Sequence, residues 1–311
     1  MRDTTGRLNR RETLKLMAAG AAAGLVPAGR VIAAERMRTR PIPVSHEPLP
    51  VVGLGTSRVF DHAPQDEAYP RLARVLAALN EFGGTVVDTS PMYGRAETTL
   101  GEVAPESGVA GNLFWATKVW TDGKQAGIRQ MQDSMDKMGV TKMDLIQVHN
   151  LVDWETHLDT LESWKESGRI RYTGITHYQA SAFDSLARVM KARKPDFVQL
   201  NYSVFDRAAE ENMLPLARDL GIAVLVNRPF LNGRAFQVTR GKDLPSIARD
   251  LQATSWAQLF LKYVIAHPAV TCVIPGTSKV SHMRDNAGAG IGPLPDKEQR
   301  KQLRALVEAL G

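Results

Sequence analysis

The sequence has one cysteine, no apolar run long enough to span a membrane, and no strong excess of either charge outside its first residues. The single thiol, Cys272, excludes an internal disulfide framework, and its apolar neighbours predict a buried, unreactive group. The seven histidines include no His-x-His pair early in the chain, which argues against a metal-dependent barrel hydrolase. We therefore expect no metal centre.

The charge of the chain is concentrated at its N-terminus. The formal net charge is +6, and residues 1–34 hold six Lys or Arg and two acidic residues. The rest of the chain is therefore only weakly basic, which does not favour binding to nucleic acid. With 311 residues, 43% of them hydrophobic and 23% charged, the composition is that of an ordinary soluble globular protein.

The first 34 residues have the pattern of an export signal. Paired arginines, Arg10 and Arg11, precede a modest apolar stretch from Leu14 to about Ala28, and small residues follow at Ala33 and Ala34. The stretch is shorter than the roughly 20 apolar residues that a stable membrane span needs. The order predicts a secretory signal, and "RRETLK" resembles a twin-arginine (Tat) signal. A disordered basic tail is the alternative, but such a tail needs no apolar stretch.

That resemblance implies a bacterial protein that the Tat export machinery carries, already folded, to the periplasm. Cleavage is expected at Ala33 or Ala34. Residues 35–49 then form an extended lead-in, and residues 50–311 form one domain because no Gly-, Ser- or Pro-rich linker divides them.

The body of the chain alternates between short apolar runs and longer amphipathic stretches. The runs are mostly continuous and rich in β-branched or aromatic residues, as strands buried on both faces are. The stretches between them, such as 68–82, 154–168 and 181–192, have the apolar spacing of helices, the last with Ser181 as its expected N-cap. The eight runs cover residues 51–56, 85–90, 113–120, 143–150, 170–177, 197–203, 222–230 and 270–277.

Eight β–α units predict an α/β fold, a single-domain (β/α)8 TIM barrel, and a span of 50–311 is close to the usual size of that fold. The last unit is longer and leaves room for an extra helix around residues 244–252. The structural alternative is a doubly wound sheet, which would show a GxGxxG loop after an early strand. The early "GLGT" at 53–56 lacks the third glycine, so we favour the barrel.

Four reactive side chains fall at or just after the ends of neighbouring predicted strands. Asp88 ends the second strand, Tyr93 follows it, Lys118 is near the end of the third, and His149 ends the fourth. Barrel enzymes place their active sites at these ends of the strands. Taken singly, Asp88 could cap a turn, Lys118 could extend to solvent and His149 could be a core histidine. Their convergence on one barrel mouth favours a catalytic site.

The four groups together make a proton donor for a carbonyl oxygen. A phenol has a pKa near 10, which a neighbouring ammonium lowers, and a carboxylate would hold that ammonium in place. An imidazole beside the phenol would orient the carbonyl. None of these side chains can donate a hydride, so the chemistry requires a nicotinamide cofactor.

These motifs resemble the signature of the aldo-keto reductase family over roughly residues 48–290. The matching elements are Asp88-x4-Tyr93-Gly94, "ATK" at 116–118 and "QVHN" at 147–150. The resemblance implies that Tyr93 is the proton donor, or the base in the oxidising direction. Lys118 and Asp88 would tune it, and His149 would position the carbonyl.

The same resemblance implies a cofactor site in the second half of the barrel. Gln199 would contact the nicotinamide carboxamide, and "VIPGTSKVSHMRDNAGA" would wrap the adenine end, with Lys279 on a 2′-phosphate. We therefore expect NADP(H) rather than NAD(H). The implied cofactor residues are Gly55, Thr56, Thr176, His177, Gln199, Arg228, Pro229, Phe230, Gly276, Thr277, Ser278, Lys279, His282 and Asn286.

Four residues depart from the family's usual pattern. Thr176-His177 stands where Ser-Asn is usual, and His282 stands where arginine is frequent. Asn227 aligns with the aromatic residue that usually stacks on the nicotinamide, so Arg228 or Phe230 would take over part of that contact. These changes affect the details of cofactor binding and leave the chemistry intact.

The expected activity is reduction of a small aldehyde or ketone to an alcohol, or the reverse, by a monomeric enzyme. Trp120, Trp154 and Tyr202 are candidates for the wall of the substrate pocket, with core packing as the alternative. A second reading keeps the fold and the cofactor but uses cofactor occupancy as a redox signal, with little turnover. The complete set of four catalytic groups favours the enzyme.

Overall fold

The computed structural model describes residues 36–310, which belong to one compact unit that begins at Arg36. The predicted signal, residues 1–34, lies outside the described residues. None of the helices in the described part of the chain is both long and apolar enough to cross a membrane.

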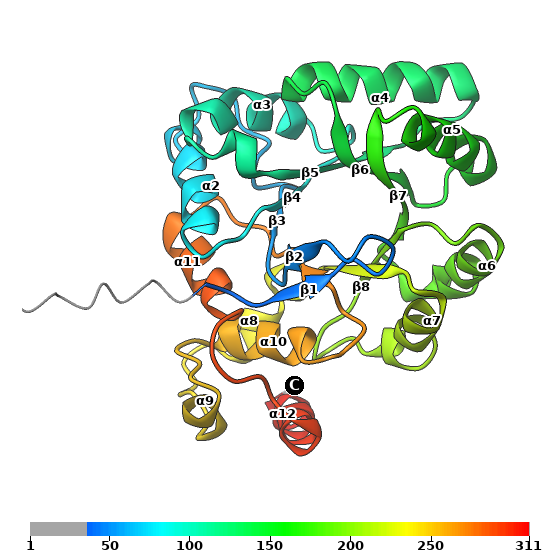
Figure 1. Ribbon diagram of the computed structural model, residues 1–311. Helices are drawn as coiled ribbons and strands as arrows, with labels where there is room; N and C mark the ends of the chain where they lie inside the picture. The colour runs from blue at the N-terminus through cyan, green and yellow to red at the C-terminus, as the bar shows by residue number, and fades with distance from the viewer. Residues whose placement is uncertain (1–35, 311) are drawn as a thin grey trace, which may run out of the picture. The chain divides into compact units, whose positions relative to one another are not determined.

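Eight parallel strands form a barrel, in the sequential order β3 to β10 (Figure 1). Bridges between Val52 and Val273 and between Gly55 and Gly276 close it. Each predicted run contains one strand, so the prediction of a single-domain (β/α)8 barrel is confirmed. The strands are β3 (Leu54–Gly55), β4 (Val86–Asp88), β5 (Phe114–Val119), β6 (Met143–His149), β7 (Ile170–His177), β8 (Phe197–Asn201), β9 (Ala223–Asn227) and β10 (Cys272–Val273).

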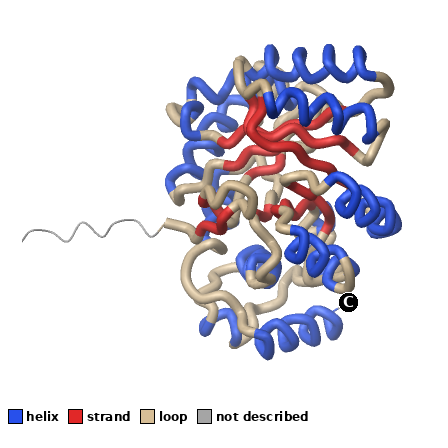
Figure 2. The backbone as a smooth tube through the Cα atoms, turned by 45° about the vertical axis from the view of Figure 1, so that its right-hand side comes forward, coloured by secondary structure: helices blue, strands red, loops and turns tan. Residues whose placement is uncertain are grey.

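Helices surround the strands, as Figure 2 shows in blue around red. Their apolar residues recur every three or four positions and face the sheet, as Leu72, Val75, Leu76 and Leu79 do in α2. The helices are α2 (Leu72–Glu81), α3 (Ala96–Glu106), α4 (Lys124–Met138), α5 (Trp154–Glu166), α6 (Phe183–Arg193), α7 (Met213–Leu220), α8 (Ala235–Val238), α9 (Ile247–Asp250), α10 (Trp256–Ile265), α11 (Val280–Gly288) and α12 (Lys297–Leu310).

Two helices differ in length or starting point from the predicted ones. The extra helix expected around 244–252 exists as the short α9. The N-cap prediction for Ser181 is wrong, because this residue lies inside a 3-10 turn, Ala180–Ala182, and α6 begins only at Phe183 with no side-chain cap. Serine often caps helices, but here the tight turn that connects β7 to α6 contains Ser181 and shifts the helix start to Phe183.

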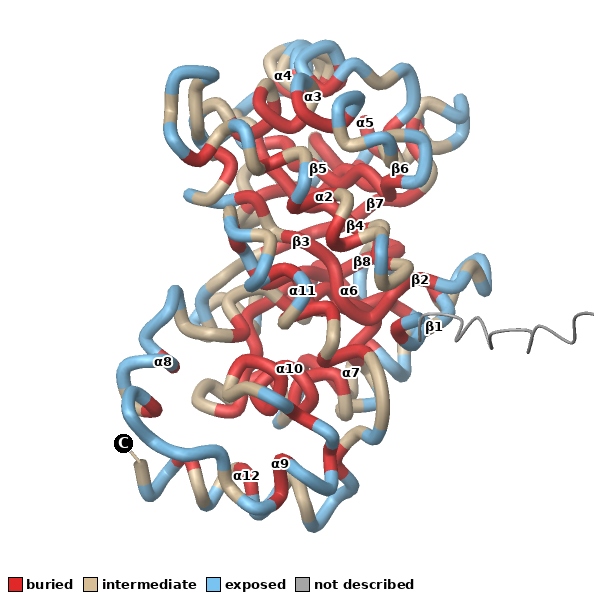
Figure 3. The backbone as a smooth tube through the Cα atoms, turned by 90° about the vertical axis from the view of Figure 1, so that its left-hand side faces the viewer, coloured by how far each residue is buried: buried red, intermediate tan, exposed pale blue. Residues whose placement is uncertain are grey.

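The described part of the expected lead-in forms an antiparallel hairpin, β1 (Thr39–Pro41) and β2 (Pro48–Pro50). Its Ile42 and Leu49 pack with side chains from the first residues of several strands, including Val86 and Phe114, inside the barrel. The hairpin therefore closes the end of the barrel opposite the strand ends that carry the polar groups. The eight barrel strands are mostly buried, whereas exposed residues lie mainly on the hairpin, the outer helices and the loops (Figure 3).

Candidate active site

A buried ion pair lies at the centre of the barrel mouth. The Lys118 Nζ donates to Asp88 Oδ2 at 2.6 Å and to the Thr89 carbonyl at 2.7 Å. Both side chains are almost completely buried, at 0% and 3% exposure. Burial by itself lowers the pKa of the Lys118 ammonium, but Asp88, followed by Tyr93, raises the pKa of this group above its ordinary value. The lysine is therefore charged.

Two glutamines hold the other oxygen of this carboxylate. Gln147 Nε2 and Gln199 Nε2 donate to Asp88 Oδ1 at 2.9 and 2.8 Å. Because Asp88, Lys118, Gln147 and Gln199 come from β4, β5, β6 and β8, the network joins four strands across the mouth. A carboxylate with all its near acceptor sites engaged is a fixed charge, which is what a buried lysine needs to keep one position.

Tyr93 lies directly over this pair. Its ring centroid is 5.0 Å from Lys118 Nζ, and its ring meets that of His149 edge to face at 5.9 Å. Burial raises the pKa of the Tyr93 phenol, and the opposing effect of the Lys118 ammonium does not cancel that rise. The Lys118 ammonium alone lowers the pKa of Tyr93, as expected. The combined effect of burial and the surrounding charges nevertheless raises this pKa. The phenol is protonated, as a proton donor must be.

His149 is held by one hydrogen bond within residues 36–310, between its Nδ1 and Ser90 Oγ at 3.1 Å. Burial, with the nearby charge of Lys118 and the neighbouring His177, lowers the pKa of His149 to about 2. The imidazole is therefore neutral and can act as a hydrogen-bond donor to a carbonyl oxygen without carrying a charge.

This lowered pKa makes a prediction about acid stability. The unfolded chain takes up a proton at His149 near pH 6.5, whereas the folded protein does so only at about pH 2. The free energy of unfolding therefore decreases as the pH falls below 6.5, and His149 contributes up to about 1.4 kcal/mol of this decrease per pH unit. His149→Gln should flatten the fall in unfolding free energy between about pH 6 and pH 4, measured by urea titration. The exposed His282→Gln is the matched control, and an unchanged slope in His149→Gln would contradict the prediction.

The residues expected to hold the nicotinamide lie beside this network. His177 Nδ1 accepts the backbone N–H of Gln179 at 3.1 Å, so the neutral ring carries its proton on Nε2. The imidazole can therefore donate where the family's usual asparagine would donate with its amide. Thr176 is buried at the same strand end, next to Gln199 in the register of β7 and β8.

Two amide oxygens at the ends of β8 and β9 are among the buried side-chain atoms that have no hydrogen-bond partner in residues 36–310. They are Asn201 Oδ1 and Asn227 Oδ1, which occupy paired positions at the ends of β8 and β9. Buried polar atoms are almost always paired, so unpaired ones at a mouth indicate a missing ligand. An amide donor such as the nicotinamide carboxamide fits these oxygens, and Asn227 Nδ2 also bonds Gln199 Oε1 at 3.3 Å.

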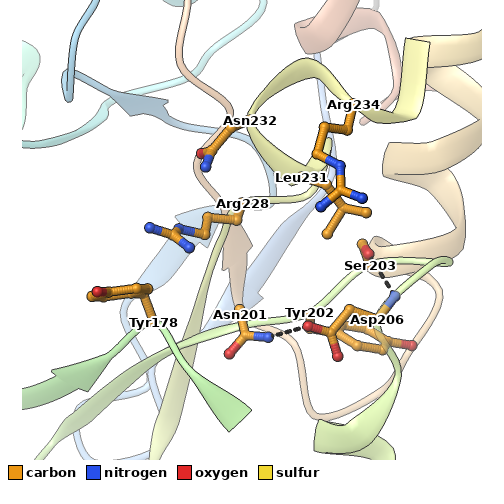
Figure 4. Close-up of a pocket in the computed structure, with 9 residues that line it drawn as sticks. All are labelled: Tyr178, Asn201, Tyr202, Ser203, Asp206, Arg228, Leu231, Asn232 and Arg234. Atoms are coloured by element: carbon orange, nitrogen blue, oxygen red, sulfur yellow. Dashed lines mark hydrogen bonds between the residues drawn. The ribbon is translucent and has the colours of Figure 1, made fainter. Parts of the chain in front are cut away.

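A polar pocket opens next to these strand ends, and Figure 4 shows its lining residues. Arg228 and Arg234 line it together with Tyr178 and Asn201. The Arg228 guanidinium stacks on the Tyr178 ring at 3.9 Å. Arg228 has a φ of 51°, a backbone conformation that is costly for a side chain of this size and is found mostly at functional sites.

Phe230, the residue after Pro229, packs toward the core. The Phe230 ring lies 4.9 Å from that of Phe236, at an interplanar angle of 50°, and packs against the core cluster. Arg228 and Phe230 were the two candidates to replace the aromatic residue that usually stacks on the nicotinamide. Of these two, Arg228 lines the pocket.

The segment expected to hold the adenine end connects β10 to α11. Gly55 and Gly276 touch here, and a Cβ on Gly55 would lie 2.8 Å from the Ile274 carbonyl oxygen, so only glycine permits this closure. Thr277 Oγ1 accepts the Lys279 N–H at 3.1 Å and shapes the turn into α11. Of the other residues expected in this segment, Ser278 is half-buried, His282 is exposed, Asn286 is buried, and Thr56 is buried beside β3.

A groove with four basic residues runs between α2 and α11, which pack side by side (Figure 1). Arg71 lies just before α2 and Arg74 in its first turn, while Lys279 lies just before α11 and Arg284 within it. Glu81 neutralises Arg284 through two hydrogen bonds of 2.8 Å. Arg74 and Lys279 have no ion-pair partner in residues 36–310, so the groove keeps a net positive charge.

The three expected wall residues have different positions. Trp120 is 42% exposed, and its ring lies 6.5 Å from that of His149, so it borders the mouth. Trp154 is half-buried at the start of α5 and packs against the core. Tyr202 lines the polar pocket beside the strand ends, but its side chain is fully buried, and its hydroxyl bonds Glu210 and Arg300.

Several residues at the site were not predicted from the sequence. Ser90 and Gln147 lie within the motifs that contain the predicted catalytic residues. Their place in these motifs could have indicated that they belong to the site. Met92, which is 40% exposed and adjoins Tyr93, offers an apolar surface at the mouth. Nothing in the sequence indicated that Arg71 and Arg74 belong to the site, because their place in the basic groove depends on the packing of α2 against α11. No group of three metal-ligating side chains is found in the described part of the chain.

A closed (β/α)8 barrel with a lysine–carboxylate pair beneath a phenol and a neutral imidazole defines a class of protein, the barrel oxidoreductases that act on carbonyl groups. A model of the Aldo/keto reductase family matches residues 51–308 of the chain. The chain therefore belongs to the aldo/keto reductase family and is an NAD(P)-dependent oxidoreductase.

Known relatives agree with this assignment along almost their whole length. The chain is 24% identical over 310 residues to the uncharacterized oxidoreductase YqkF of Bacillus subtilis, covering 87% of this chain and 95% of that protein. Among solved structures it is similar to an aldo/keto reductase from Klebsiella pneumoniae in complex with NADP and acetate, with a TM-score of 0.74, 24% identity, and coverage of 88% and 95% of the two chains. An aldo-keto reductase from the same organism in complex with NADPH gives a TM-score of 0.71 at 25% identity, covering 87% and 95%.

Proposed function

We propose that the protein reduces a small aldehyde or ketone to an alcohol, or catalyses the reverse, with Asp88, Tyr93, Lys118 and His149 as its catalytic residues. The observation that carries this proposal is the contact of the Tyr93 ring with both Lys118 Nζ, at 5.0 Å, and the His149 ring, at 5.9 Å. A protonated phenol between a buried cation and a neutral donor is suited to one task, the protonation of an oxygen that becomes negative.

The proposed mechanism assigns one step to each group. A nicotinamide cofactor, when bound, would supply the hydride for the carbonyl carbon. His149 donates a hydrogen bond that orients the carbonyl oxygen, and Tyr93 transfers its hydroxyl proton to that oxygen as charge develops there. The Lys118 ammonium stabilises the phenolate that remains, and Asp88 keeps the ammonium in place.

A direct assay tests this function. Purified protein with NADPH and a panel of small aldehydes and ketones should show substrate-dependent loss of NADPH absorbance. The redox-sensor reading predicts instead tight NADPH binding with turnover no faster than that of Tyr93→Phe. Binding without turnover over the whole panel, in both directions, would contradict the enzymatic proposal.

We propose NADP(H) as the preferred cofactor. The basic groove between α2 and α11 supports this choice, because Lys279 and Arg74 offer unpaired positive charge next to the segment that would hold the adenosine. The two Klebsiella pneumoniae structures contain NADP and NADPH. A 2′-phosphate is the part of the cofactor that such charges distinguish from NAD(H).

Removal of these two charges should change cofactor selectivity. Arg74→Ala/Lys279→Ala is expected to raise the Kd for NADPH about tenfold to a hundredfold, as lost charge-assisted hydrogen bonds do, and to leave the Kd for NADH unchanged. Fluorescence titration of both cofactors measures this. Lys142→Ala, at an exposed position just before β6, is the matched control. An equal loss of affinity for both cofactors would place the 2′-phosphate elsewhere.

We propose that the Tat machinery exports the folded protein to the periplasm, on the basis of the paired arginines and the apolar stretch that follows them. Replacing Arg10 and Arg11 with lysines should retain the protein in the cytoplasm, as measured by fractionation and immunoblotting. Export of the variant at the level of the original chain would contradict the proposal. Since the periplasm is not expected to supply NADPH, we propose that the cofactor is carried along, and denaturation of the periplasmic protein should release it.

A further inference from the structure

The side chain of Ser90 is placed where it can decide which nitrogen of His149 carries the proton. Ser90 lies between Asp88 and Tyr93 in the loop after β4 and is fully buried. Its Oγ is 3.1 Å from His149 Nδ1. The same oxygen accepts the backbone N–H of Met92 at 3.4 Å. No other partner contacts this hydroxyl in residues 36–310.

The count of hydrogens distinguishes the two neutral forms of His149. If Nδ1 carried the proton and donated it to Ser90, the serine oxygen would accept twice and its own hydrogen would be left without an acceptor in a dry place. An unpaired buried donor is costly. If Ser90 instead donates to Nδ1 and accepts from Met92, all of these groups are paired. The proton of the imidazole is then on Nε2.

We propose that Ser90 is a positioning residue that keeps His149 in the tautomer with its proton on Nε2, ready to donate to the substrate's carbonyl oxygen. The inference rests on the proposed function of His149. The opposite tautomer would present a lone pair to the carbonyl oxygen and repel it. A single hydroxyl thus fixes both the orientation of the ring and the polarity of its reactive edge, as outer hydrogen-bond partners of functional histidines generally do.

The tautomer can be read without any substrate. In a protein labelled with ¹⁵N-histidine, the ring of His149 should show a pyrrole-type Nε2 and a pyridine-type Nδ1, with its signals assigned by their loss in His149→Gln. Ser90→Ala should give mixed or reversed tautomers. A protonated Nδ1 in the original chain, or an unchanged pattern in Ser90→Ala, would overturn the proposal. This result stands even if no substrate is turned over, so its failure differs from a failure of the proposed function.

Kinetics provide the second readout. Ser90→Ala should lower kcat for a carbonyl substrate about tenfold to a hundredfold, with a smaller effect on KM and no effect on the Kd for NADPH. Ser90→Thr, which retains the hydroxyl, should recover most of the turnover and the tautomer pattern. Ser134→Ala removes another fully buried serine, in α4, and controls for the loss of a buried hydroxyl. A kcat for Ser90→Ala equal to that of Ser134→Ala would overturn the positioning role.

Discussion

Tyr93→Phe should lower the kcat for carbonyl reduction by about 10²–10⁴-fold, the usual contribution of a positioned general acid. The change removes one hydroxyl and keeps the ring, which makes the edge-to-face contact with His149 at 5.9 Å. The Kd for NADPH should therefore stay the same while turnover is lost. Single-turnover reduction of an aldehyde, with cofactor binding followed by fluorescence, separates the two effects.

Tyr69→Phe is the matched control, because its hydroxyl bonds Glu102 on the outer surface at 3.0 Å and has no part in the proposed site. This variant should keep the original kcat. Near-normal turnover in Tyr93→Phe would assign the proton transfer to another group. A parallel loss of NADPH affinity would instead indicate that the phenol supports the cofactor site.

The reactive centre could be predicted from the sequence because it depends on strand ends. A continuous apolar run that stops at a charged residue reveals the strand and the position of its end, as with Val87 before Asp88. In a barrel of parallel strands, all such ends lie at one mouth. The topology alone therefore predicts that Asp88, Lys118 and His149 lie close together. The hydrogen bond between Lys118 and Asp88 and the contacts of Tyr93 with Lys118 and His149 show this proximity.

Side-chain direction beyond the strand ends could not be predicted in the same way. Tyr202 comes directly after β8 and borders the polar pocket, yet its side chain is fully buried because Glu210 and Arg300 bind its hydroxyl. Glu97 is similar. It lies in the first turn of α3, where an acidic residue is ordinarily exposed, yet its carboxyl group is buried and accepts from Thr117, beside Lys118, at 2.6 Å. Both outcomes depend on contacts between elements far apart in the sequence.

The ion pair beneath the phenol leads to the second large prediction. Lys118→Met should lower kcat about 10²–10³-fold, since the charge that stabilises the developing phenolate is removed. It should also lower the unfolding free energy by about 3–5 kcal/mol, because the carboxylate of Asp88 stays buried without its cation. Gln147 and Gln199 still donate to Asp88 Oδ1, but they cannot neutralise the charge.

A double variant separates the catalytic effect from the structural one. Asp88→Asn/Lys118→Met removes both charges, and its Asn side chain can still accept from the two glutamines. Its unfolding free energy, measured in urea, should therefore lie above that of Lys118→Met, so that the two single changes are not additive. Its kcat should stay as low as that of Lys118→Met, because neutrality restores the fold but not the cation. Recovery of turnover together with stability would mean that the pair only supports the barrel, and that Tyr93 transfers its proton without help from the lysine.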